Sequence, residues 1–97
     1  MSTDTLSKSK EKTKKAPLYK VLLLNDDYTT WEFVCFVLMR FFNKTLDEAN
    51  QITQDVHTKG VGLAGVYEFE IAETKAESVN SSARKEGHPF RAIVEPE

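Results

Sequence analysis

The 97-residue sequence has one cysteine, Cys35, and this scarcity removes two classes of site. A lone cysteine cannot form an intramolecular disulfide, and no Cys/His spacing resembles that of a structural zinc site. No apolar run approaches the roughly 18 residues that a membrane span needs, and the N-terminus lacks the apolar segment of a signal peptide. We therefore expect an unprocessed cytoplasmic protein with no metal and no membrane anchor.

Glycine is also scarce, with four residues, and none of them belongs to a nucleotide-binding motif. There is no P-loop and no G-x-G-x-x-G followed by a helix, so we expect no cofactor. Gly62 and Gly65 lie inside an expected strand instead. Glycines in such positions suggest that another part of the backbone approaches closely.

Positive charge is concentrated in residues 1–16, which contain five lysines against Asp4 and Glu11, a net charge of +3. This segment has few apolar residues, so it cannot bury enough surface to offset its ordering entropy, and we expect a disordered basic arm. The remaining 81 residues carry eight basic and 13 acidic side chains, a net charge of -5. They form no basic stripe that would extend the arm, so we expect no nucleic-acid binding.

From Pro17 onward the apolar pattern predicts one folded domain, residues 17–97, in the order β-α-α-β-α-β. The Thr45 and Glu48 pair forms a capping box at the start of the second helix, and Gly60 is a suitable stop for it. The expected elements are a strand over 19–24, helices over about 30–42 and 45–60, a strand over 61–69, a helix over about 72–86 and a strand over 90–95.

The element order restricts the topology of the sheet. Two consecutive helices return the chain antiparallel to the first strand, whereas a single-helix crossover leaves the third strand parallel to the second. The most economical solution places the first strand in the middle of a three-stranded antiparallel sheet. We therefore predict an α+β fold, a two-layer sandwich with all three helices on one face.

The segment Asn25-Asp26-Asp27 follows the first strand and precedes the first helix, where an amide and two carboxylates can meet a small cation. Thr29 and Glu32 have capping-box spacing, so we expect them to hold the helix start. The helix dipole favours ionised Asp26 and Asp27. The alternative is an ordinary turn, since Asn and Asp are common turn formers.

The second expected helix contributes Thr53, Val56 and His57 at positions i, i+3 and i+4, so the three side chains share one face. An imidazole beside a small polar and an apolar side chain can form half of a binding site. The alternative is a surface or capping histidine near a helix C-terminus. His88, between Gly87 and Pro89, is expected to be a loop residue.

Enzymatic function is weakly supported. Asp26, Asp27 and His57 could serve as a general acid/base set, but Cys35 lies in an apolar helix with no activating base, so a nucleophile is missing. The same three groups lack a fourth metal ligand. The sequence therefore favours a binding module over an enzyme, and an acid/base hydrolase remains a distant third possibility.

Several ordered motifs between residues 17 and 97 resemble the ClpS family, small adaptors that recognise destabilising N-terminal residues and hand the substrates to a Clp ATPase. The motifs are Tyr19-Lys20-Val21, Asn25-Asp26-Asp27-Tyr28-Thr29, Glu32-Phe33-Val34, Val56-His57, Ala72-Glu73-Thr74-Lys75 and His88-Pro89. The resemblance implies a non-enzymatic, monomeric adaptor for N-degrons that begin with Phe, Tyr, Trp or Leu. It also implies the two-layer sandwich with an extended N-terminal arm.

The resemblance further implies a role for each matching residue. Asn25 and His57 would bind the substrate α-ammonium directly, Asp27 through water, and Asp26 would meet the peptide backbone. An ammonium needs acceptors, so protonating His57 should weaken peptide binding as the pH falls. The first side chain would enter a pocket formed by Thr29, Trp31, Val34, Thr53, Val56 and Phe90.

Two pocket positions depart from the family pattern. Thr30-Trp31 stands where relatives commonly have Pro-Met, and Thr53 stands where a Met is common. Trp31 either narrows the pocket or swings aside, and Thr53 returns some volume. The alternative for Trp31 is structural packing against Phe90.

Glu70 and Lys75 match positions that, in the family, contact the N-terminal domain of a ClpA-type unfoldase. A solvated helix face would give the same pattern at these positions. The runner-up function is a ribosomal-stalk-like interaction domain, which shares this architecture but has no evident use for Asn25, Asp27 and His57 together.

Overall fold

The computed structural model describes residues 16–97, and the elements in this range follow the predicted order. The predicted basic arm lies outside the described residues, apart from Ala16. Within 16–97 no helix has the length and apolar character needed to cross a membrane. The elements are β1 (Leu18–Leu24), α2 (Trp31–Phe42), α3 (Leu46–Lys59), β2 (Val61–Glu68), α4 (Phe69–Glu86) and β3 (Arg91–Pro96).

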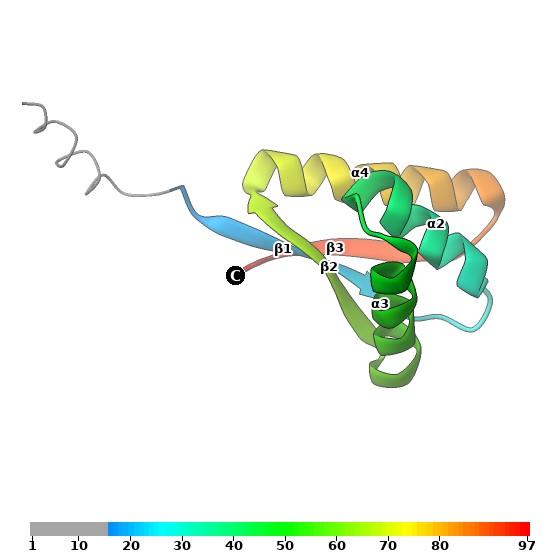
Figure 1. The fold of residues 1–97 in the computed structure, drawn as a ribbon. Coiled ribbons are helices and arrows are strands. Elements are labelled where there is room, and N and C mark those ends of the chain that lie inside the picture. The colour runs from blue at the N-terminus through cyan, green and yellow to red at the C-terminus, as the bar shows by residue number, and fades with distance from the viewer. Residues whose placement is uncertain (1–15) are drawn as a thin grey trace, which may run out of the picture.

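The central strand of the sheet is β1, as predicted. The strand order is β2-β1-β3, and β1 is antiparallel to both neighbours. Leu23 pairs with Gly62 on one side and with Ala92 on the other. Figure 1 shows β1 ending beside α3, so the loop that follows β1 emerges next to that helix.

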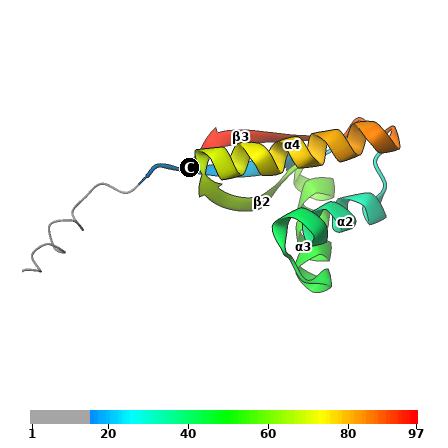
Figure 2. The same ribbon diagram turned by 90° about the horizontal axis from the view of Figure 1, so that it is seen from above.

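One face of the sheet carries the core. Val21 and Leu23 on β1 are fully buried, while Leu22 and Leu24, which point to the other face, are half-buried. α4 lies along the strands, and the α2–α3 hairpin lies on the β2 side of the sheet (Figure 2). The predicted α+β sandwich is therefore confirmed. The inward side chains of α4 are Ala72, Ala76, Val79 and Ala83, all buried.

The start of α2 differs from the prediction. Thr30, not Thr29, caps the helix, because its hydroxyl accepts the Phe33 N–H at 3.1 Å. The Thr29 hydroxyl donates to Asp26 at 2.6 Å, and among residues 16–97 no helical N–H group donates to it. The predicted Thr29 and Glu32 capping box is wrong, whereas the Thr45 and Glu48 box at the start of α3 is confirmed.

α4 starts three residues earlier than expected, at Phe69 rather than Ala72. Its N-cap, Glu68, makes no side-chain capping hydrogen bond, so the sequence carries no cap signal at the true start. As a result, Glu70 lies in the first turn of the helix, and Lys75 lies in its second turn.

Glycine allows α3 to pack closely on β2. A Cβ atom at Gly62 would lie 2.6 Å from Val56 Cγ2 and 3.1 Å from the Ile52 carbonyl oxygen. Both atoms belong to α3, so the close approach predicted for a strand glycine occurs here. This contact sets the distance between the sheet and the helix that carries Thr53, Val56 and His57.

Candidate functional site

The loop after β1 is tied to the C-terminal end of α3. The Asn25 N–H donates to the Gly60 carbonyl at 3.0 Å, and the Gly60 N–H donates to the Val56 carbonyl at 3.0 Å. Gly60 has a positive φ of 87°, a conformation that glycine adopts without steric cost. These bonds bring the strand end beside the last turns of α3, where His57 lies.

Asp26 shapes the loop from within. Its Oδ1 accepts the Tyr28 and Thr29 N–H groups at 2.8 and 2.7 Å, and its Oδ2 accepts the Thr29 hydroxyl at 2.6 Å. Burial alone would raise the pKa of Asp26, but these hydrogen bonds and the nearby His88 together lower it. Asp26 is thus held as a carboxylate that fixes the loop, which is the turn-forming role that the sequence analysis gave as the alternative.

Nine of the ten residues predicted for substrate binding line one cavity. The cavity has a volume of about 310 Å³ and lies between the β1–α2 loop, the start of α2 and the face of α3. The lining residues are Asn25, Asp26, Asp27, Thr29, Trp31, Val34, Thr53, Val56 and His57.

Phe90 is the predicted residue that does not line this cavity. It is 3% exposed and packs edge-on against Phe33, with ring centroids 6.1 Å apart. The hollow that Phe90 borders is a different one, beside His88 at the start of β3. Its position indicates a core residue that supports α2 from behind.

The inner wall of the cavity is apolar or has satisfied polar groups. Val34 and Val56 are 5% and 3% exposed. Thr53 is 3% exposed, and its hydroxyl donates to the Ala49 carbonyl at 2.7 Å, so it does not need a ligand as a partner. This wall is suited to an apolar side chain, because no buried polar group is left without a hydrogen bond.

The mouth of the cavity is polar. The side chains of Asn25, Asp27 and His57 are exposed, and they form no hydrogen bond with another side chain or backbone group of residues 16–97. Their oxygen and nitrogen atoms can therefore accept hydrogen bonds from a ligand. An apolar wall with converging acceptors at its rim fits an amphipathic cation.

Trp31 is 40% exposed and lies between the two halves of this site. Its indole N–H donates to Asn50 Oδ1 at 2.9 Å, and its ring meets that of His57 edge-on, with centroids 6.4 Å apart. No contact joins its ring to Phe90 among the aromatic pairs of residues 16–97, so the predicted alternative of packing against Phe90 is wrong. Asn50 does not line the cavity, and the sequence analysis did not single it out as a partner of Trp31.

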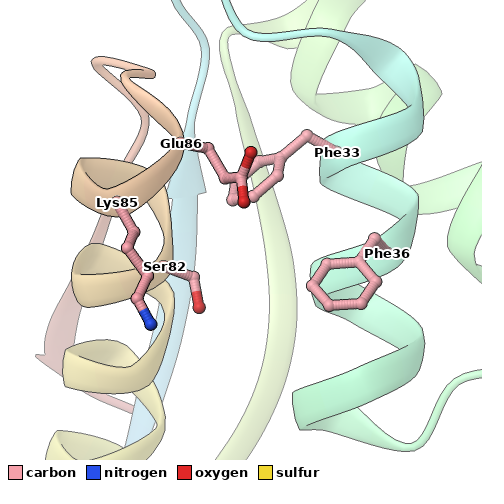
Figure 3. A pocket seen from close by; sticks show the side chains of 5 residues that line it. All are labelled: Phe33, Phe36, Ser82, Lys85 and Glu86. Atoms are coloured by element: carbon pink, nitrogen blue, oxygen red, sulfur yellow. The ribbon is translucent and has the colours of Figure 1, made fainter.

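A second hollow lies on the other side of α2. It has a volume of about 410 Å³ and separates α2 from the last turns of α4. In Figure 3, Phe33 and Phe36 of α2 point toward α4, and Ser82 and Glu86 of α4 face them. We call it the α2–α4 groove. Its charged groups, Lys85 and Glu86, are adjacent on one helix and of opposite sign.

The two residues predicted to contact an unfoldase have different environments. Glu70 is exposed. Lys75 is half-buried, and its ammonium donates to the Phe41 carbonyl at 2.7 Å and lies 5.2 Å from the centre of the Tyr67 ring. Lys75 therefore joins α4 to the C-terminal end of α2.

Metal ligands do not cluster in the described part of the chain. Among residues 16–97 no three His, Cys, Asp or Glu side chains lie close enough together to hold an ion. Cys35 is a free, buried thiol. The chemistry available at the cavity is therefore hydrogen bonding and apolar contact.

The sequence also matches a family of known proteins. The family model described as "ATP-dependent Clp protease adaptor protein ClpS" matches residues 14–93. A ClpS adapter protein from Parvibaculum lavamentivorans is 54% identical over 95 residues, which cover 98% of this chain and 86% of that protein. One from Hyphomonas neptunium is 52% identical over 94 residues, covering 97% and 80%.

A solved structure is similar over the folded region. Agrobacterium tumefaciens ClpS2, bound to L-phenylalaninamide, matches with a TM-score of 0.83 and 40% sequence identity. The match covers 86% of this chain and 100% of that chain.

Proposed function

The chain belongs to the ClpS family of ATP-dependent Clp protease adaptor proteins, and we propose that the cavity after β1 is where it holds the N-terminus of a substrate. The protein is a non-catalytic adaptor that delivers N-degron substrates to a Clp protease. A ribosomal-stalk-like domain and an acid/base hydrolase are accordingly set aside. The observation that carries the proposal is the polar mouth joined to an apolar wall.

The α-ammonium of the substrate binds at the mouth. It offers three donors and a positive charge, which match the amide oxygen of Asn25, the carboxylate of Asp27 and a neutral imidazole nitrogen of His57. Asn25 and His57 bind it directly, and Asp27 acts through water. Asp26 holds the loop and has further lone pairs for the backbone of the substrate. The unpartnered, exposed state of the three acceptors supports this assignment.

The first side chain of the substrate occupies the inner cavity against Thr29, Val34 and Val56. Burying a Leu or Phe side chain contributes about 1.5 to 3 kcal/mol, and each charge-assisted hydrogen bond contributes about as much. The bound L-phenylalaninamide of the Agrobacterium relative, an aromatic residue with a free α-amine, supports a specificity for Phe, Tyr, Trp and Leu.

The partner surface begins at Glu70. We propose that it meets the N-terminal domain of a ClpA-type unfoldase, because this carboxylate lies between the exposed side chains of Phe69 and Ile71, 47% and 49% exposed. Protein interfaces combine apolar side chains at the centre with polar ones at the rim. Lys75 supports the surface from within, through its bond to Phe41. The protein acts as a monomer in the cytoplasm, where its single thiol stays reduced.

Binding of a fluorescent peptide that begins with Phe tests the site. Asn25→Ala, Asp27→Asn and His57→Ala should each weaken binding roughly ten- to a hundredfold, because the two Ala variants each remove an acceptor from the ammonium and Asp27→Asn removes the negative charge that faces it. The matched control is Asp47→Asn, an exposed carboxylate at the other end of α3. If the three site variants bind as tightly as the control, the proposed site is wrong.

A further inference from the structure

We infer that Asn50 is a positioning residue that holds Trp31 as a fixed wall of the cavity, and so helps to set which first residues are accepted. The inference rests on the proposed function and extends it to a residue outside the predicted site. Trp31 opens α2 and Asn50 lies on α3, nineteen positions further along the chain. The 2.9 Å hydrogen bond between the indole N–H and Asn50 Oδ1 therefore joins the two helices beside the cavity, which Trp31 lines and Asn50 does not.

The acceptor atom of Asn50 is itself held from the other side. The Cys35 thiol donates to the same Oδ1 at 3.2 Å, and its sulfur lies 3.4 Å from the Thr53 hydroxyl oxygen. Thr53 is anchored by its bond to the Ala49 carbonyl. A continuous series of polar contacts thus links the exposed indole to the buried wall of the cavity.

This arrangement decides between two roles for Trp31. A tryptophan that swings aside would leave the width of the cavity to the substrate. Here the indole N–H lies on one edge of the ring and is hydrogen-bonded to Asn50 on α3. Rotation of the ring about its χ1 or χ2 bond would break that hydrogen bond. The edge contact with His57 limits its movement toward the ammonium site. The width available to a first side chain then depends on Asn50.

Two substitutions at Asn50 distinguish the loss of its hydrogen-bond acceptor from a change in side-chain volume. Asn50→Leu keeps a similar volume and removes the acceptor, whereas Asn50→Asp keeps an oxygen for the indole N–H. With free-amine peptides that differ only in their first residue, Asn50→Leu should raise the affinity of the Trp peptide relative to the Leu peptide roughly two- to tenfold. Asn50→Asp should keep the ratio of the unmodified protein.

A double-mutant cycle tests whether the effect passes through Trp31. Phenylalanine has no N–H, so in a Trp31→Phe background Asn50→Leu should leave the Trp-to-Leu ratio unchanged. The sequence has one tryptophan, so its indole N–H gives a single resonance in a ¹H–¹⁵N spectrum. That proton should exchange faster with solvent in Asn50→Leu than in Asn50→Asp.

Any of three results would overturn the inference. The Trp-to-Leu affinity ratio could stay unchanged in Asn50→Leu, or it could change as much in Asn50→Asp as in Asn50→Leu. Asn50→Leu could also change the ratio equally in the Trp31→Phe background. Acetylated versions of the same peptides separate this failure from failure of the proposed function. If free-amine peptides bind much better than acetylated ones while the ratio stays constant, the ammonium site is correct and only the role of Asn50 is wrong.

Discussion

The cavity after β1 and the α2–α4 groove lie on opposite sides of one helix, and the smaller of the two has the features of a ligand site. The groove has the greater volume, about 410 against 310 Å³, and the large aromatic walls of Phe33 and Phe36. Its charged side chains stand next to each other on α4. In the cavity, by contrast, acceptors from a loop and a helix converge above an apolar wall. Convergence of groups from separate elements identifies the site better than size does.

Among the variants that separate the two hollows, Gly62→Ala should have the largest effect, because it displaces α3, which lines the cavity and not the groove. The new methyl group would meet Val56 and the Ile52 backbone, so α3 must move away from β2. Overpacking of this kind costs about 1 to 3 kcal/mol, and we expect peptide affinity to fall at least tenfold as His57 moves with the helix. Denaturant unfolding and peptide titration measure the two effects.

Leu63→Ala is the control for Gly62→Ala, because Leu63 is the next residue on β2 and is 46% exposed on the other face of the sheet. It should leave peptide affinity within about twofold of the unmodified protein. Equal losses in both variants would mean that the distance between α3 and β2 is not what positions the site.

Two neighbours on α2 distinguish the hollows directly. Val34 lines the cavity and Phe36, half exposed, lines the groove. Val34→Ala removes two methyl groups and should weaken binding of a Phe peptide roughly tenfold, whereas Phe36→Ala should change it less than about twofold. If Phe36→Ala lost as much affinity as Val34→Ala, the result would indicate that the ligand binds in the groove and not in the cavity.

Acidification should affect the cavity through His57. A protonated imidazole cannot accept a hydrogen bond from an ammonium and repels its charge, so peptide affinity should fall roughly three- to tenfold once the solution is acid enough to protonate it. In His57→Ala the remaining dependence should be small. His88→Gln alters the histidine whose ring is tilted by 49° against that of Phe33 in the groove, and this variant should keep the full dependence. Affinity that does not change with pH would remove His57 from the ammonium site.

The smallest effect concerns the stability of the loop that supports the cavity. The pKa of Asp26 is lowered in the folded protein, so its carboxylate stabilises the fold above its ordinary value of 3.8, and this contribution is lost as the pH falls through the folded pKa. Asp26→Ala should cost about 1 kcal/mol at neutral pH, because solvent screens this partly exposed carboxylate, and less in acid, where the protonated carboxyl of the unmodified protein makes weaker hydrogen bonds. Urea unfolding at both pH values checks this, and a cost that does not change with pH would contradict it.

The sheet and its central strand could be predicted because they follow from pattern alone. An apolar strand, a capped helix pair and a single-helix crossover leave few topologies, and the buried positions of α4 match the inward face read from its spacing. The starts of α2 and α4 could not be read in the same way. Thr29 is committed to Asp26, and Glu68 caps without a side-chain bond, so the local signals were misleading or missing.

The site residues also divide into those that the sequence predicts and those that it does not. Local spacing grouped Asn25, Asp26 and Asp27 in one loop and Thr53, Val56 and His57 on one face of α3, whereas the resemblance to ClpS supplied Thr29, Trp31 and Val34. Phe90 does not line the cavity, and its assignment to the substrate site stays a prediction, because the sequence does not reveal to which side a residue at the start of a strand points. Asn50 was missed, because its bond to Trp31 depends on how α2 and α3 pack.

The measurement that most directly tests the cavity as the substrate site compares two peptides that begin with Phe and differ only in acetylation of the α-amine. Acetylation removes the charge and two of the three donors that Asn25, Asp27 and His57 are placed to meet. We predict that the acetylated peptide binds at least about a hundredfold more weakly in a calorimetric or fluorescence titration. Equal affinity for the two peptides would contradict the account.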